Sequence, residues 1–165
     1  MRDIFLKIDG LKGESLDDSH KDEIDVLDWK WGLEQTGTAH VGMGGGAGKV
    51  RVKDLSVTKH VDKATPELFK ACCNGKVFKE ATLTVRKAGE KPLEYLKIKM
   101  SDVQISKMEI DSKMEIAGNG NEDFLTEYVS LHFDQVEVEY TPQKSDGSSD
   151  AAVTTGWNIK TSKEL

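Results

Sequence analysis

The chain has 165 residues, 32% of them charged, and a net charge of −6 at pH 7 with acidic and basic residues interleaved. This length suits one domain with a buried core, which we expect to span residues 1–165. The charge pattern excludes the basic stripe of a nucleic-acid groove, and no apolar stretch reaches transmembrane length, so neither nucleic-acid binding nor membrane insertion is expected.

The N-terminal part predicts two strands separated by a long turn. Residues 4–8 alternate between apolar and polar, as a short strand does, and a segment rich in glycine, aspartate and serine follows. From Asp25 the alternation is clean again. Tryptophan buries a large apolar area, so we expect the tryptophan side of this strand to face the core and Lys30 to point away from it. The residues expected on the core side are Leu27, Trp29, Trp31 and Leu33.

A glycine-rich loop, Gly42–Lys49, lies before the next strand pattern. It is not a phosphate-binding loop, because Met43 stands where such a loop needs glycine and Val50 where it needs Ser or Thr. Nucleotide-binding loops also open a helix, whereas alternating valines follow here. Glycine gives backbone freedom and close approach, so the segment is either a projecting contact arm or a floppy hairpin tip. The contact arm would comprise His40, Val41, Gly42, Met43, Gly44, Gly45, Gly46, Ala47, Gly48 and Lys49.

One helix is predicted between Thr65 and Gly75. Thr65 is a candidate N-cap, Pro66 suits the first turn and Gly75 suits the C-cap. The chain on both sides of it alternates as strands do, with Leu83 and Leu131 on the expected core side. No strand–helix–strand rhythm is present, so we predict a mainly β fold: an antiparallel β-barrel with one flanking α-helix and an extended glycine-rich loop.

Three local irregularities are also expected. The apolar phase shifts near Lys107, which indicates a bulge, and slips again at Asp134–Gln135, as it would where a strand bends around a barrel corner. Trp157 and Ile159 predict a last short element. Residues 161–165 are expected to fray, as chain ends often do.

The sequence contains no recognisable catalytic or metal-binding motif. The histidines at positions 20, 40, 60 and 132 have no metal-ligand spacing, and Cys72 and Cys73 are adjacent, so they form no disulfide framework. No nucleophile elbow occurs. We expect neither enzymatic activity nor a cofactor, and no cleavable signal peptide, because no apolar run follows a basic N-terminal region.

Polar residues occupy the non-core sides of several predicted strands. Residues 82, 84 and 86 are Thr, Thr and Arg, and residues 130, 132 and 134 are Ser, His and Asp. Such sides are either ordinary solvated exterior or a wall between a subunit interface and a water-filled passage, and composition alone does not separate these.

A series of motifs in order along nearly the whole chain resembles one family, the haemolysin co-regulated proteins (Hcp), which form the inner tube of the bacterial type VI secretion system. The motifs are Asp3–Ile8, Gly13–Ser15, Glu23–Leu27, Trp29-x-Trp31-Gly32, Gly44–Lys49, Leu83–Gly89, Glu94-Tyr95, Tyr140-x-Pro142-Gln143 and Gly156-Trp157.

The resemblance implies hexameric rings that stack into a tube, a partner sheath, baseplate and tip, and secretion of the tube with effectors in its lumen. It places the arm at ring or stacking contacts and Lys30 in the lumen, where the family usually has a small polar residue. It implies assembly in the cytoplasm and release outside the cell. The alternative from a different class is a monomeric β-barrel that binds a small ligand, and a cryptic enzyme is a more remote one.

Overall fold

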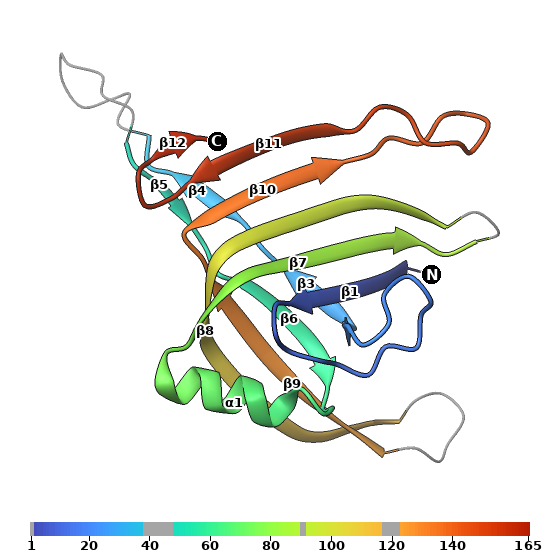
Figure 1. Ribbon diagram of the computed structural model, residues 1–165, viewed down its shortest axis with the longest axis vertical. Helices are drawn as coiled ribbons and strands as arrows, with labels where there is room; N and C mark the ends of the chain where they lie inside the picture. The colour runs from blue at the N-terminus through green and yellow to red at the C-terminus, as the bar shows by residue number, and fades with distance from the viewer. Residues whose placement is uncertain (1, 38–47, 90–91, 117–122) are drawn as a thin grey trace.

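A computed structural model describes residues 2–37, 48–89, 92–116 and 123–165, and it shows a mainly β protein with one helix (Figure 1). Ten strands form one large antiparallel sheet, and β4 and β5 form a separate hairpin. The elements are β1 (Arg2–Ile8), β2 (Ile24–Asp25), β3 (Asp28–Lys30), β4 (Leu33–Gln35), β5 (Val50–Val52), β6 (Leu55–His60), α1 (Thr65–Asn74), β7 (Val77–Lys87), β8 (Leu93–Ile116), β9 (Asp123–His132), β10 (Gln135–Tyr140), β11 (Val153–Asn158) and β12 (Lys163–Glu164).

The long strand β8 organises the sheet. Its first part pairs with β7 and β10, and its second part pairs with β9. From β8 the sheet runs one way through β10 and β11 to β12 and the other way through β7 and β1 to β2, while β9 adds β6 and β3. The bulge predicted near Lys107 is confirmed, since the β8–β9 register shifts between Ile105 and Lys107.

The two branches of the sheet approach each other at the link between β2 and β3. The Val26 amide donates to the Ile4 carbonyl of β1 at 2.9 Å, and the next amide, that of Leu27, donates to the Thr58 carbonyl of β6 at 2.8 Å. The chain therefore passes from one branch to the other over two residues. Within the described ranges, β2 is paired with β1 and β3 with β6, and the strand pairs themselves do not complete a closed barrel.

This crossing corrects the expected core. Val26 takes the inward position and is 7% exposed, so the side-chain phase shifts by one residue and Leu27 is 44% exposed. Leu33 lies beyond the sheet in the β4–β5 hairpin and is 55% exposed. The placement of these two leucines in the core was wrong for the isolated chain. Trp29 and Trp31 are half-buried and pack against the core, whereas Leu83 and Leu131 are completely buried.

Helix α1 covers the end of the sheet formed by β8 and β9 (Figure 1). Its predicted C-cap is confirmed: Gly75 adopts a left-handed conformation, with φ of 67°, and its amide donates to the Ala71 carbonyl at 3.0 Å. The predicted N-cap is wrong. Ala64 occupies the cap position without a side-chain bond, because the Thr65 hydroxyl donates to Glu127 instead, at 2.9 Å.

The C-terminal tail is ordered into the sheet, against the expectation that residues 161–165 fray. Lys163 and Glu164 pair with Asn158 and Trp157 of β11. Gly156 makes room for this packing, since a Cβ there would lie 2.9 Å from a methyl group of Leu165. The slip expected at Asp134–Gln135 marks the corner where β9 ends and β10 begins.

Candidate functional sites

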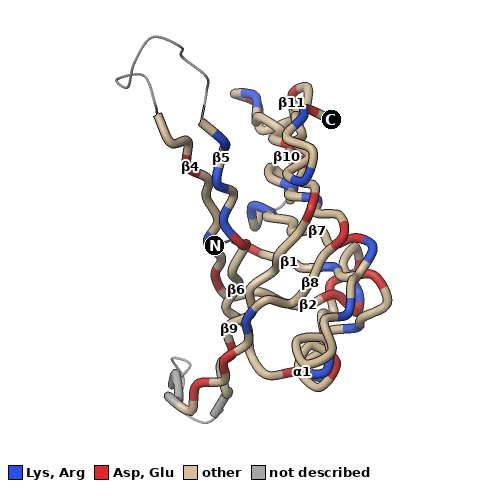
Figure 2. The backbone as a smooth tube through the Cα atoms, turned by 90° about the vertical axis from the view of Figure 1, so that its left-hand side faces the viewer, with Lys and Arg blue, Asp and Glu red and all other residues tan. Residues whose placement is uncertain are grey.

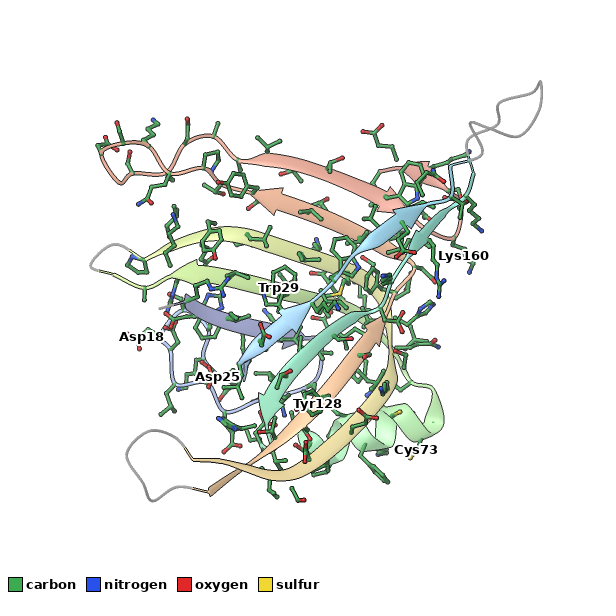
Figure 3. The ribbon with its side chains drawn as sticks, turned by 180° about the vertical axis from the view of Figure 1, so that it is seen from behind. Asp18, Asp25, Trp29, Cys73, Tyr128 and Lys160 are labelled. Atoms are coloured by element: carbon green, nitrogen blue, oxygen red, sulfur yellow. The ribbon has the colours of Figure 1, made fainter. Side chains whose placement is uncertain are left out.

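A polar face covers the strands β3, β6 and β9 and the second part of β8, on the side away from the core. Figure 3 shows these strands toward the viewer. Register aligns Lys30 with Ser56, Ser56 with Ser130, and Ser130 with Lys107, which makes one row across four strands. The neighbouring row contains Asp28, Thr58, Tyr128 and Glu109. We call these two rows the Lys30 face.

The charges of the Lys30 face are arranged in stripes. The first row has a lysine at each end and two serines between them, whose hydroxyl oxygens lie 2.9 Å apart. The second row has a carboxylate at each end. Lys107 and Glu109 join the rows through an ion pair of 3.3 Å, but both side chains are more than half exposed, so this pair stabilises the fold little. Both rows are thus charged at their ends; the middle of the first row is small and polar, whereas the second row carries Tyr128, which is 41% exposed.

Beside the Lys30 face, Asp54 holds two neighbours that superficially resemble a catalytic set. The Ser106 hydroxyl donates to Asp54 at 2.6 Å, and His132 Nδ1 lies 3.0 Å from the other oxygen of the same carboxylate. A nucleophilic serine must instead hand its proton to the histidine. Because Ser106 is bonded to the carboxylate and His132 is 55% exposed, the arrangement is a surface network without an activated nucleophile.

An apolar groove of about 830 Å³ separates the β4–β5 hairpin from the strands β10 to β12. The indole of Trp31 is fixed at its base, since its N–H donates to the Lys53 carbonyl at 2.9 Å. Trp157 closes the other wall. The apolar side chains that line the groove are Trp31, Leu33, Val50, Val52, Val136, Val138 and Trp157. Such a groove is typical of a surface that another protein segment covers.

The base of the glycine arm is a close backbone contact. A Cβ at Gly48 would lie 2.2 Å from the Thr36 carbonyl oxygen, so only glycine lets the two arms of the hairpin meet there. Lys49 is exposed. The other predicted arm residues, His40 to Ala47, lie outside the described residues. Lys30, the predicted lumen residue, is exposed on β3, and Trp29 lies on the opposite side of that strand, toward the core.

A second cluster, which no sequence pattern indicates, fastens the loop of residues 9–23 to the sheet. His20 is 7% exposed, stacks on Phe5 with ring centroids 4.2 Å apart, and contacts Glu23 and Glu94 with its two ring nitrogens at 2.8 and 2.7 Å. Arg86 also lies over the Phe5 ring, with its guanidinium carbon 5.0 Å from the ring centroid. No periodicity marks such a cluster, because its members come from distant parts of the chain; His20 and Glu94 alone are 74 residues apart.

Arg86 completes the fastening by pairing with Asp17 in the loop and Asp3 on β1. Hydrogen bonding to Arg86 lowers the pKa of Asp17 from 3.8 to about 2, and the same bond raises the pKa of Arg86. Burial alone would raise the pKa of Glu94, but hydrogen bonds from Lys97 and His20 outweigh it, and the pKa is lowered. These shifts favour the charged forms of Asp17, Arg86 and Glu94.

The described part of the chain has no cluster of three or more His, Cys, Asp or Glu side chains that could hold a metal ion. Its helix is also too short and too polar to cross a membrane.

Comparisons with known proteins agree with the motifs. The family described as "Type VI secretion system effector, Hcp" matches residues 5–140. The chain is 52% identical over 160 residues to Protein hcp1 of Pseudomonas aeruginosa, covering 96% of this chain and 95% of that protein. Its structure is similar to the crystal structure of Hcp1 from Salmonella typhimurium, with 39% identity, a TM-score of 0.79 and 99% of both chains covered.

A further solved structure, described as that of a type six secretion system protein, matches with a TM-score of 0.89 at 28% identity. The match covers 100% of this chain and 100% of that chain. Matches of this extent define the class: a structural, non-enzymatic component of a secretion machine. The chain belongs to the Hcp family and is a type VI secretion system tube protein, itself secreted by that system.

Proposed function

We propose that this protein forms hexameric rings that stack into the type VI tube, with the Lys30 face lining the lumen and the glycine arm contacting neighbouring copies. The observation that carries the proposal is the family match over nearly the whole chain, including 96% coverage by Protein hcp1 of Pseudomonas aeruginosa. The proposal extends to the other parts of the machine: sheath, baseplate and tip proteins outside the tube, and effectors inside it. Assembly would take place in the cytoplasm before release.

The sheet would act as a barrel in this assembly. Adjacent amides at residues 26 and 27 bond to β1 and β6 in turn, so the chain itself bridges the two branches where strand pairing stops. A tube wall under mechanical load needs such a continuous layer of hydrogen bonds. Its interior is filled by side chains, among them the completely buried Leu55, Leu83, Met100 and Leu131, and this favours a structural role over a small-ligand carrier.

The Lys30 face suits a lumen wall because its side chains are polar or charged, with Tyr128 as the one aromatic group among the eight residues of the two rows. The hydroxyl groups of Ser56 and Ser130 share one hydrogen bond of 2.9 Å, and these small side chains leave a polar centre in the first row. The charges at the margins would repeat in every subunit of a ring. The summed charge would favour the entry into the lumen of protein surfaces with the opposite charge. Lys30 would supply one such positive position per subunit.

The cargo role can be tested with Lys30→Glu and the neutral control Lys30→Ser. We expect both variants to assemble as wild type does, and the charge-reversed variant to co-purify with a different set of secreted effectors. If the rings stay intact and the cargo is unchanged, Lys30 does not line the lumen. If the rings are lost, Lys30 lies at a contact between subunits.

The arm role can be tested by deleting residues 44–48. We expect the shortened protein to keep its β-sheet circular dichroism but to lose ring closure or stacking, because these glycines would contact a neighbouring copy. Assembly indistinguishable from wild type would contradict a contact role for the arm.

A further inference from the structure

His20 is a buried ionisable side chain to which the proposed tube function assigns no role. It lies in the loop of residues 9–23, at the point where the loop meets the sheet. Its Nδ1 lies 2.8 Å from Oε2 of Glu23, and its Nε2 lies 2.7 Å from Oε1 of Glu94 on β8. Each ring nitrogen therefore faces a carboxylate oxygen at hydrogen-bond distance.

These two contacts require the ring to carry two N–H groups. A carboxylate only accepts hydrogen bonds, and a neutral imidazole donates from one nitrogen alone, whichever tautomer it adopts. Burial alone would raise the pKa of Glu94, but its hydrogen bonds with Lys97 and His20 lower it, so this carboxylate is ionised at neutral pH. With both carboxylates ionised, only the imidazolium form of His20 satisfies both contacts.

The surroundings of the ring suit a cation. The ring stacks on Phe5, with centroids 4.2 Å apart and planes 8° from parallel, and the face of an aromatic ring attracts a cation. Carboxylates also outnumber cationic side chains around it. The charged groups around the site are Lys7 on β1, Asp9, Asp17 and Glu23 in the loop, Glu80 and Arg86 on β7, and Glu94 and Lys97 on β8.

Solvent can reach this buried site. A polar pocket of about 200 Å³ lies beside His20, and Lys7, Glu80 and Lys97 are among the other residues that line it. A buried group exchanges its proton readily where water comes close to it. The pocket therefore lets His20 gain or lose a proton without unfolding of the protein.

The loop that carries His20 is braced internally and joined to the rest of the fold by polar contacts. Two of its amides, those of Gly13 and Ser15, donate to the carbonyls of residues 22 and 23 at 2.7 and 3.0 Å. A loop with its own hydrogen bonds can loosen from the sheet as one piece. Its contacts with other elements include those of His20 with Glu94, Asp17 with Arg86, and Glu14 with the Lys63 amide.

We propose that His20 is a proton-operated latch, whose imidazolium form holds the loop of residues 9–23 against the sheet and whose neutral form loosens it. Without the second ring proton, one nitrogen turns a lone pair toward a carboxylate, so an attraction becomes a repulsion. The latch is closed where His20 is protonated and both carboxylates are ionised. It opens as the pH rises through the titration of His20, because the folded loop binds the proton more tightly than the loosened loop does.

Two measurements on the full chain test the latch between about pH 5 and about pH 9, a range that spans the titration of an ordinary histidine. Nuclear magnetic resonance of ¹⁵N-labelled histidine shows whether one or both ring nitrogens carry a proton. Amide hydrogen exchange, corrected for the intrinsic rate at each pH, measures loosening of the loop. The amides of Asp9 and Lys63 report on it directly, since they join the loop to the Glu80 carbonyl at 3.0 Å and to the Glu14 carboxylate at 2.9 Å.

Three variants accompany wild type. His20→Gln cannot titrate, and Glu94→Gln keeps the histidine but removes one of its two carboxylates. His132→Gln is the matched control, because His132 also contacts a carboxylate, but through one nitrogen and with its side chain 55% exposed.

We expect both ring nitrogens of His20 to carry protons at the acid end of the range. The protection of the Asp9 and Lys63 amides should fall about tenfold as the ring loses its proton, since a hydrogen bond to a charged group contributes about that factor. This step should be absent in His20→Gln and unchanged in His132→Gln. In Glu94→Gln the ring should lose its proton at a lower pH than in wild type.

A His20 ring that is neutral over the whole range, or one that never loses its proton, would overturn the latch. A titration that leaves the loop amides equally protected would do the same, as would a wild-type step that persists in His20→Gln. None of these readouts needs a ring, so failure of the latch and failure of ring assembly are distinguishable.

Discussion

Lys59 and Glu127 face each other across β6 and β9 with both side chains completely buried, and their ammonium and carboxylate groups are in direct contact. Asp62 also accepts from Lys59, at 2.8 Å, and Thr65 donates to Glu127 at 2.9 Å. The network thus ties the start of α1 to two of the strands that carry the Lys30 face. One oxygen of Glu127 has no hydrogen-bond partner among the described residues. The buried carboxylate is therefore stabilised chiefly by its contacts with Lys59 and Thr65.

Breaking this pair from one side should be strongly destabilising. Lys59→Met leaves the Glu127 carboxylate buried without its cation, and we expect a loss of about 3–5 kcal/mol in the free energy of unfolding. The double variant Lys59→Met/Glu127→Leu should lose less, because no buried charge is left unpaired. Urea denaturation of both variants measures this. A double variant less stable than the single one would show that the pair contributes by attraction rather than by mutual neutralisation.

The phase shift at the link between β2 and β3 predicts different costs for two leucines. Leu83→Ala opens a cavity at a completely buried position and should cost about 2–5 kcal/mol. Leu27→Ala removes a side chain that is 44% exposed and should cost less than about 1 kcal/mol. Chemical denaturation at matched protein concentration compares them. Equal losses of unfolding free energy in the two variants would show that Leu27 is a core residue.

Asp17 should contribute to stability in a defined pH window. Its pKa is depressed from 3.8 to about 2 by Arg86, so folding is favoured while the carboxylate is ionised, and this contribution is fully present above about pH 4. It is lost as the pH falls through about 2. Asp17→Asn should therefore be less stable than wild type at neutral pH, and the difference should shrink between about pH 4 and about pH 2. A difference independent of pH in acid denaturation would contradict the ion pair.

Gly48 and Gly32 should respond differently to a methyl group. Gly48→Ala forces a Cβ against the Thr36 carbonyl oxygen, whereas a Cβ at Gly32 meets no atom within 4 Å. We expect faster amide hydrogen exchange in β4 and β5 for Gly48→Ala and an unchanged pattern for Gly32→Ala. If both variants exchanged like wild type, the hairpin base would not depend on close approach at Gly48.

Local patterns predicted those features that depend on local chemistry. Gly75 ends the helix because glycine readily adopts the left-handed conformation that stops it, and the bulge at Lys107 is visible as a break in apolar alternation. The outward position of Lys30 on β3 could be predicted because the neighbouring Trp29 packs against the core and successive side chains of a strand alternate. The inward placement of Leu27 was wrong because the chain changes its hydrogen-bonding partner from β1 to β6 at residues 26–27. The alternation of apolar residues does not indicate which strand is the neighbour.

The features that the sequence did not reveal depend on distant partners. Lys59 alternates with Leu55 and Val57 on the core side, and only the position of Glu127 on the adjacent strand makes a buried lysine acceptable. The tail follows the same principle: residues 161–164 are polar, yet β12 pairs with β11 and Leu165 packs over Gly156. The groove, likewise, is formed by residues from both ends of the chain.

The central claim is that this chain builds rings, and light scattering on the gel-filtered protein with negative-stain images of the same peak tests it most directly. Hexameric rings would appear as annular particles with a mass about six times that of the 18.3 kDa chain. A monomer that stays monomeric up to the highest concentration reached, with no annular particles, would contradict it.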